Sequence, residues 1–266
     1  MELDLVNNPY CIGFNNGVYC LCCDQFWFGA TGLDSDPHLS VGYNFDYDVD
    51  PDLIKEINEY MTSLWPKAEE REAMWDFLAS CLEGGNSDGK LYAWLGTGAN
   101  GKTVLLELLK QVFGDYLVYG PSDMLTQERP PKDLFGRPTT RLQETHTNLL
   151  GTRLLIINEP GINLNSRLVK DLVTMKPIEY RPLYGTTMTY TPMFKAITAI
   201  NQPFMIKVDD YGLQKRIQYR EFPSTFVHRP NGSENQFKAN HSLTDRFPKW
   251  RMAFMSLLLN RYKANM

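Results

Sequence analysis

The residue types best suited to chemistry stand between a short apolar run and a long one, in the stretch Gly-Thr-Gly-Ala-Asn-Gly-Lys-Thr. Glycines let consecutive backbone N–H groups point inward, where they can hold phosphate oxygens. Lys102 can reach the β- and γ-phosphates of a nucleotide, and the Thr103 hydroxyl can ligate Mg²⁺. The simpler alternative is a glycine turn ahead of a core helix. The pattern favours a triphosphate site formed by Gly96, Thr97, Gly98, Ala99, Asn100, Gly101, Lys102 and Thr103.

The elements on both sides must place this loop. "KLYAWL" at 90–95 is a short apolar run typical of a buried strand. "KTVLLELLKQVFG" at 102–114 predicts a helix that is apolar on most of its faces and ends at Gly114. A helix N-terminus placed here adds the positive end of its dipole to the site. The order strand, glycine loop, helix is what the nucleotide interpretation requires.

Two further apolar runs end in polar residues. "TRLLIINEP" at 152–160 predicts a buried strand ending at Asn158 and Glu159, and "MFKAITAINQPF" at 193–204 predicts another with Asn201 near its end. In P-loop ATPases an acidic pair at such a strand end orders Mg²⁺ and polarises the attacking water. An asparagine on the neighbouring strand can hold that water or the γ-phosphate. Taken singly, each is also an ordinary polar strand end or turn. Together they predict Lys102, Glu159 and Asn201 as catalytic residues and Thr103, Glu159 and Asn158 as Mg²⁺ ligands.

Composition limits the other possibilities. The chain has 266 residues, of which 43% are hydrophobic and 12% aromatic, and its net charge is −4. These values suit a folded globular protein. Nucleic-acid binding would need a local basic patch or an assembled channel, because the whole chain is not basic. The first residues lack the pattern of a signal peptide, and no apolar run approaches the ~20 residues that span a bilayer. We therefore expect an intracellular protein with no membrane partner.

The pattern of residue types, and the secondary structure that it predicts, changes along the chain. We expect a β-rich segment at 1–50, where "NNG" between apolar runs indicates a hairpin, and a helical segment at 51–88. A core of strands and helices follows at 89–228, and "MAFMSLLL" indicates a buried helix face in a carboxy-terminal helical segment at 229–266. The predicted fold class is α/β, with a mostly parallel sheet in the core.

The five cysteines are Cys11, Cys20, Cys22, Cys23 and Cys81. The cluster at 20–23 suggests zinc, but a closed zinc site usually takes two spaced pairs of ligands, and the sequence shows no second pair at a matching distance. The spacing favours reduced thiols. Whether the cluster binds a metal stays open at this point.

A second candidate region lies at 178–194. Apolar and polar residues alternate with a period of two on both sides of "GTT" at 185–187, which predicts two paired strands and a projecting turn. Its tyrosines are more commonly half-buried sheet residues than platforms for bases. A ring of such turns can nevertheless grip single-stranded DNA, with ~1–3 kcal/mol for each base that stacks. The predicted DNA contacts are Arg181, Tyr184, Gly185, Thr186 and Thr187.

These pieces, in this order, resemble the superfamily 3 helicases, which are AAA+ motors of viral and plasmid replication. The resemblance is greatest to the helicase part of the poxvirus-type primase-helicases of large DNA viruses and phages. It covers most of the chain. The segments that carry it are "FNNGVY", "FDYD", "GTGANGKT", "LLIINEP", "LVKDLVTMKPIEYRPLYG", "AITAINQPF" and "GLQKRIQYREFPSTF".

The resemblance implies an ATP- and Mg²⁺-dependent DNA helicase with an AAA+ P-loop core. It further implies a homo-oligomer, a hexamer, that encloses single-stranded DNA at a fork, and a primase domain in cis or in trans. In a viral setting it would act in the replication compartment of the host cell. It assigns Arg216 as an arginine finger acting on the neighbouring subunit. The alternative for Arg216 is a structural ion pair with Asp209 or Asp210.

This sequence departs from the family pattern at two places. Asn158 stands where many ATPases have Asp, and "TMK" at 174–176 replaces Gly-Gly-Asp in the hairpin motif. Two other functions therefore stay open. One is a nucleotide-gated DNA-binding ring without unwinding activity. The other is a different P-loop enzyme such as a nucleotide kinase, which would need an arginine-rich lid and an acceptor pocket that the sequence does not display.

Overall fold

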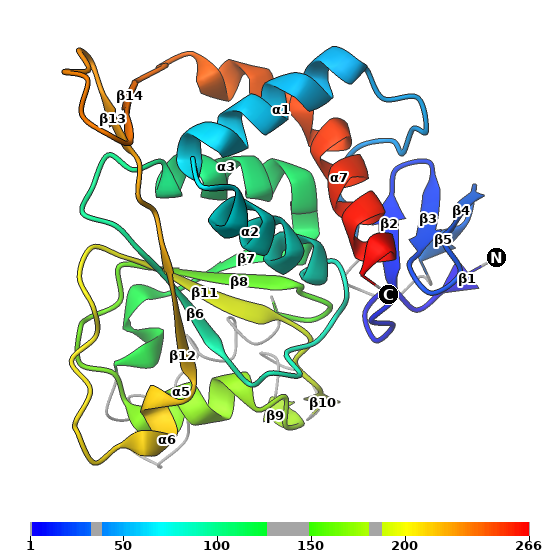
Figure 1. Ribbon diagram of the computed structural model, residues 1–266. Coiled ribbons are helices and arrows are strands. Elements are labelled where there is room, and N and C mark those ends of the chain that lie inside the picture. Colours follow the sequence, from blue (N-terminus) through cyan, green and yellow to red (C-terminus); the bar gives the residue numbers. More distant parts are fainter. Residues whose placement is uncertain (1, 33–38, 127–148, 181–187, 266) are drawn as a thin grey trace.

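The computed structural model describes residues 2–32, 39–126, 149–180 and 188–265. Its centre is a sheet in which every neighbouring pair is parallel, in the order β12-β6-β11-β8-β7. Helices lie on both faces of this sheet (Figure 1). The predicted α/β class with a P-loop core is confirmed. The strands are β6 (Leu91–Leu95), β7 (Leu117–Gly120), β8 (Leu154–Asn158), β11 (Lys195–Ile200) and β12 (Ile217–Glu221).

Successive side chains along each strand point to opposite faces of the sheet. Because the strands are apolar along most of their length, both faces of the sheet are apolar. On β8, Leu154 and Ile156 belong to one hydrophobic cluster, and Leu155 and Ile157 belong to another on the opposite face. All four side chains are fully buried. The continuous apolar runs in the sequence are thus explained by burial on two sides.

The first face is covered by the longer helices. They are α1 (Pro51–Leu64), α2 (Ala68–Ser80), α3 (Lys102–Phe113) and α7 (Phe247–Ala264). α1 begins where the Asp50 side chain accepts a hydrogen bond from the Asp52 N–H at 2.9 Å, and Gly114 at φ 54° ends α3. The predicted buried face near the carboxy terminus is confirmed by α7, in which Met255 and Leu258 are fully buried. Within the described ranges, no helix is long and apolar enough to cross a membrane.

The second face is covered by shorter elements. These are α5 (Ser166–Val173) and α6 (Tyr211–Gln214), with the 3-10 helix η2 (Ser122–Leu125) beside them. Another 3-10 helix, η1 (Gly114–Tyr116), joins α3 to β7. The backbone of β9 (Ile178–Tyr180) pairs antiparallel with β10 (Met188–Tyr190), which confirms the predicted pairing of these strands.

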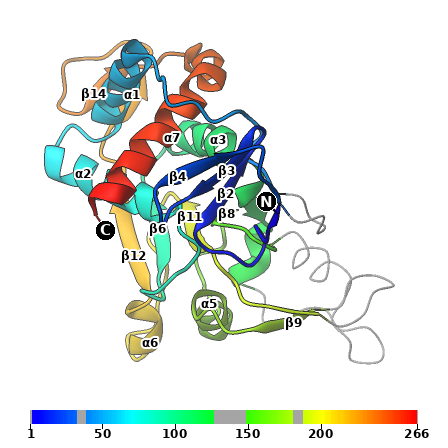
Figure 2. The same cartoon turned by 90° about the vertical axis from the view of Figure 1, so that its right-hand side faces the viewer.

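The amino-terminal segment forms a small antiparallel sheet of β2 (Cys11–Phe14), β3 (Gly17–Cys20) and β4 (Gln25–Phe28). The predicted hairpin is confirmed, with Asn15 and Asn16 at its turn. This sheet lies beside α7 (Figure 2). A further parallel pair joins β1 (Glu2–Leu3) to β5 (Thr31–Gly32).

A ribbon of two short strands follows the central sheet. β13 (Thr225–Val227) pairs with β14 (Gln236–Lys238), and the 3-10 helix η3 (Leu243–Arg246) then leads into α7. The Phe226 N–H donates to the Ala99 carbonyl at 2.7 Å, so the ribbon is tied to the glycine loop. The chain thereby returns to the loop after completing the sheet.

Candidate nucleotide-binding site

The loop between β6 and α3 has the backbone shape that cradles an anion. Gly98, Ala99 and Gly101 all have positive φ, at 109°, 48° and 83°. Gly101 must also stay small, because a Cβ there would lie 2.4 Å from Leu64 Cδ2. No side chain caps α3, so its first N–H groups keep the positive end of the helix directed at the loop. The predicted strand, loop and helix are confirmed.

Lys102 is folded back into this loop. Its exposed fraction is only 6%, and its Nζ donates to the Gly96 carbonyl at 2.7 Å, to Asn100 Oδ1 at 3.0 Å and to Asn201 Oδ1 at 3.3 Å. Burial lowers the pKa of Lys102, and the nearby Glu159 carboxylate opposes that shift. The ammonium group is therefore a buried cation whose partners are neutral oxygens.

Asn201 connects this cation to the carboxylate. Asn201 Nδ2 donates to Glu159 Oε1 at 3.4 Å, while its Oδ1 accepts from Lys102. Glu159 stands at φ 46°, a conformation uncommon for a residue with a Cβ, and its N–H is held by the Ala199 carbonyl at 2.9 Å. Parallel strands bring their carboxyl ends to one edge of the sheet. The three predicted catalytic residues on this edge are therefore joined by hydrogen bonds.

The predicted Mg²⁺ ligands can be tested by their chemistry and access. Thr103 lies in the first turn of α3, and Asn158 and Glu159 lie at the end of β8; all three are exposed. They offer a hydroxyl, an amide and a carboxylate oxygen, which are the hard donors that Mg²⁺ prefers, and one carboxylate is enough for a site completed by phosphates and water. The residues fit the ion.

Asn100 has one half of its amide satisfied and the other half free. Its Oδ1 accepts from Lys102, while its Nδ2 is buried and has no partner among the described residues. A Cβ on Gly96 would lie 1.8 Å from this Nδ2. The glycine therefore makes room for the amide, and a buried N–H₂ next to the anion cradle is a donor that a phosphate oxygen can satisfy.

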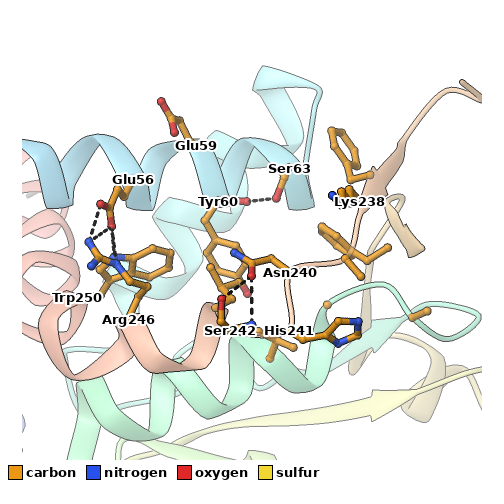
Figure 3. A pocket seen from close by; sticks show the side chains of 17 residues that line it. Glu56, Glu59, Tyr60, Ser63, Lys238, Asn240, His241, Ser242, Arg246 and Trp250 are labelled. Carbon is orange, nitrogen blue, oxygen red and sulfur yellow. Dashed lines mark hydrogen bonds and ion pairs between the residues drawn. The ribbon is translucent and has the colours of Figure 1, made fainter. Parts of the chain in front are cut away.

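A cavity of about 630 Å³ opens directly beside the loop (Figure 3). Ala99 and Gly101 form its border with the loop, and Val104 of α3 continues the wall. This volume lies within the ~300–1,000 Å³ typical of small-molecule sites. The other lining residues come from α1, the β13–β14 ribbon, the connection from β14 to η3, η3 and α7: Glu56, Glu59, Tyr60, Ser63, Phe226, Phe237, Lys238, Ala239, Asn240, His241, Ser242, Leu243, Arg246 and Trp250.

Two pairs of aromatic side chains are among the residues that line this cavity. The rings of Phe226 and Phe237 lie 5.9 Å apart, and the ring of Tyr60 lies 5.6 Å from that of Trp250. Tyr60 extends from α1 into the cavity (Figure 3). Its hydroxyl is buried and has no partner within the described part of the chain, and burial raises its pKa well above the usual range. At the far end, Glu56 accepts from Arg246 and from Trp250 Nε1.

Arg216 lies at the opposite edge of the sheet. It directly precedes β12, and its carbonyl accepts from the N–H of Leu91, the first residue of β6. The length of β6, roughly 13 Å at ~3.3 Å per residue, separates this position from the glycine loop. Arg216 NH1 donates to the Gly212 carbonyl at 3.0 Å. Asp210 pairs instead with Lys170, and among the described residues Arg216 forms no ion pair.

The predicted DNA contacts lie outside the described residues. This holds for Arg181, Tyr184, Gly185, Thr186 and Thr187, which all fall between β9 and β10. The cavity residues, in contrast, were missed by sequence reasoning. The spacing of α1 predicts that Tyr60 faces inward, but nothing in the sequence brings it together with the ribbon at 225–238.

Fold and site together define a P-loop α/β protein. No protein-family model matches the sequence. The chain is 31% identical to "Putative helicase L207/L206" of Acanthamoeba polyphaga mimivirus, over 98% of this chain and 27% of that protein. It is 24% identical to "Putative primase C962R" of African swine fever virus (strain Badajoz 1971 Vero-adapted), over 73% of this chain and 20% of that protein. Eight curated relatives match the sequence of this chain with statistical significance.

A solved structure shows the same fold. The apo C-terminal region of NrS-1 (305–718) matches with a TM-score of 0.55 and 12% identity, over 86% of this chain and 53% of that chain.

The sequence matches relate the chain to proteins of large DNA viruses that are named as putative helicases and primases, and the resemblance predicted from its motifs is confirmed. The chain spans about a quarter of the length of the curated relatives it matches.

Proposed function

We propose that this chain is the ATP-hydrolysing part of a DNA helicase of the superfamily 3 type. One observation carries the proposal: Lys102, Asn201 and Glu159 form a continuous hydrogen-bonded set at the carboxyl edge of the sheet, next to the glycine loop. Relatives named as helicases support a helicase-type role. The reaction is the attack of water on the γ-phosphate of ATP, driving movement along DNA.

Each residue has a role that its position allows. Lys102 exchanges its neutral partners for the β- and γ-phosphates and offsets their charge. Glu159 orients the attacking water and accepts its proton, since it is the exposed carboxylate of the set. Asn201 is bonded to both residues and senses the γ-phosphate. Thr103, Asn158 and Glu159 would hold Mg²⁺, and the bound ion would neutralise charge on the phosphates.

The cavity beside the loop suits the nucleoside. Because Ala99 and Gly101 form part of its wall, a nucleotide whose phosphates lie in the loop would place its base and sugar there. Phe226 and Phe237 supply apolar ring faces on which a base can pack.

DNA binding and ring assembly complete the proposal. Arg181 and residues 184–187 contact the DNA strand in a central channel. Arg216 lies too far from its own loop and serves the loop of a neighbour in a closed ring, a hexamer by the resemblance. Near it, Val208 and Tyr211 are 83% and 66% exposed, which suits an edge that a second subunit covers. A primase domain acts in cis or in trans.

The decisive experiment measures ATPase activity with and without single-stranded DNA, and strand displacement on a forked duplex. We expect DNA to stimulate hydrolysis and hydrolysis to drive displacement. Stimulated hydrolysis without displacement would instead favour a nucleotide-gated DNA-binding ring. Phosphoryl transfer to a small acceptor, with no response to DNA, would favour a nucleotide kinase. Replacing residues 184–187 by Gly-Ser should weaken DNA binding and uncouple hydrolysis from displacement, while basal hydrolysis stays intact.

The nucleoside site is tested by comparing ATP with inorganic tripolyphosphate, which has phosphates but no base. Phe237→Ala should weaken ATP binding by about fivefold, as expected for the loss of one aromatic contact of ~1 kcal/mol, and leave tripolyphosphate binding unchanged. Phe28→Ala is the matched control, because Phe28 is exposed and lies outside the cavity. Equal losses for both ligands would place the base elsewhere.

A further inference from the structure

The turn between β3 and β4 gathers three thiols. The sulfur atoms of Cys20, Cys22 and Cys23 all lie within 4.8 Å of one another, and the Cys20 and Cys22 sulfurs are 3.0 Å apart. Cysteine binds metals as the thiolate, and sulfur atoms gathered at such distances can share one ion. The turn therefore has a ligand pair, Cys20 and Cys23, with two residues between them.

A fourth thiol comes from the neighbouring strand. Cys11 on β2 stands directly opposite Cys20 in the antiparallel register, so both side chains point to the same face of the sheet. Cys11 and Cys20 are both buried, while Cys22 and Cys23 are exposed, and the Cys11 sulfur lies outside the group of three whose sulfur atoms are all within 4.8 Å of one another. The sequence did not reveal this arrangement, because strand pairing and not chain spacing supplies the fourth ligand.

We propose that Cys11, Cys20, Cys22 and Cys23 bind one Zn²⁺ ion as a closed structural site. Tetrahedral Zn²⁺ with Zn–S bonds of ~2.3 Å places its sulfur ligands ~3.8 Å apart, a value inside the range that the three turn thiols span. Binding displaces the thiol protons to solvent and leaves four thiolates on the metal. With four protein ligands no position stays open for a substrate, so the ion stabilises the fold.

The turn between β3 and β4 contacts the end of α7, so an ion bound in the turn would stabilise a tertiary contact. Asp24, next to Cys23, forms an ion pair with Lys263 at the end of α7 and accepts from the Tyr19 hydroxyl at 2.6 Å. A rigid turn fixes this carboxylate. The ion therefore locks the small amino-terminal sheet against α7, which packs on the helices of the core. This proposal does not depend on the proposed function.

The test uses the whole chain, purified under reducing conditions without chelator and then dialysed. We expect about one Zn²⁺ per chain by mass spectrometry of the metal, and a lower melting temperature after a strong chelator removes it. Adding Co²⁺ to the metal-free protein should produce the visible and near-ultraviolet absorption of tetrahedral cobalt bound to thiolates. Readding Zn²⁺ should abolish this absorption.

Variants assign the ligands. Cys23→Ser changes an exposed side chain and should lower Zn²⁺ affinity by more than the ~10–100-fold that loss of an outer-shell partner causes. Cys11→Ser should do the same. Cys81→Ser is the matched control, because Cys81 is buried at the end of α2, bonds to the Phe77 carbonyl and should leave metal content unchanged. A metal-free protein without the cobalt–thiolate absorption, or a disulfide within the cluster that forms in reductant, would overturn the proposal.

Discussion

Both edges of the central sheet hold buried cations, and they hold them differently. At the amino edge, Arg153 and Lys195 stand at the starts of β8 and β11 and are 1% and 8% exposed. Lys195 Nζ donates to the carbonyls of Ser80 and Gly85 at 2.8 and 3.1 Å, and Arg153 donates to that of Asn8 at 2.7 Å. These partners are fixed backbone atoms from distant parts of the chain, so both cations join segments of the fold.

At the carboxyl edge, Lys102 has partners that can be exchanged. Two of them are amide side chains, at 3.0 and 3.3 Å, and the second of these also contacts the exposed carboxylate of Glu159. An arriving phosphate can replace the amide oxygens without unfolding anything. Lys102 thus differs from Lys195 in that two side-chain amides, as well as the Gly96 backbone carbonyl, hold it.

The largest expected effect separates the two edges directly. Lys102→Ala should abolish ATP hydrolysis and most triphosphate affinity, because the loop loses its mobile positive charge. Lys195→Ala should instead lower the free energy of unfolding by about 2–6 kcal/mol, because two partly buried carbonyls lose their donor at ~1–3 kcal/mol each. Nucleotide titration and chemical denaturation of both variants measure this. Normal turnover in Lys102→Ala would remove the loop from the active site.

Arg216 tests whether the amino edge is purely structural. Arg216→Ala should bind ATP normally and form rings, but hydrolyse ~10³–10⁵-fold more slowly, the scale of losing a finger supplied in trans. Mixed with Lys102→Ala, it should recover part of the activity, because some interfaces then pair an intact loop with an intact finger. The measurement is ATPase rate across mixing ratios, with mass photometry to verify mixed rings.

A structural role for Arg216 predicts a different result. Its bond to the Gly212 carbonyl would then hold α6 against β12. In that case the variant should melt at a lower temperature, and mixing should restore nothing. A flat rate of zero over verified mixed rings would exclude the trans finger.

Glu159 gives the next largest effect. Glu159→Gln should still bind ATP but turn over at least ~100-fold more slowly, the usual scale for losing a positioned base. Asn158→Asp is the matched control on the preceding residue and should be tolerated or modestly activating, because it adds a carboxylate beside the Mg²⁺ position. The roles are wrongly assigned if Asn158→Asp inactivates the protein while Glu159→Gln does not.

The smallest effect is a difference in pH response. Burial lowers the pKa of Lys102, although Glu159 opposes the shift, so the charged form is lost at a pH below the ~10.4 of a free lysine. Binding of a non-hydrolysable ATP analogue should therefore weaken on raising the pH, and should do so before the pH reaches the ~10.4 of a free lysine, while the fold stays intact. Lys102→Arg, which stays charged, should flatten this profile. An equally steep decline in the arginine variant would assign the titration to another group.

Much of the fold follows from local patterns. The helix at 51–64 was predictable from Asp50, Pro51 and the spacing of its apolar residues, and the strand, loop and helix at 91–113 from one glycine motif. The carboxyl-edge residues were also predictable, because parallel strands must end together. Tyr60 was not, since a tyrosine on a helix face looks like any core residue until the ribbon and α7 surround it.

The sequence by itself determined the glycine loop between β6 and α3, because glycines, lysine and threonine at that spacing constrain the backbone within a few residues. Only the tertiary structure decided which cations are structural, where a cavity adjoins the loop, and that Cys11 meets Cys20. Those facts depend on strand register and on contacts between segments far apart in the chain, as in the Cys11–Cys20 pairing and the Lys195 bond to Ser80. Residue spacing encodes local geometry, whereas long-range contacts arise from packing that many different spacings can satisfy.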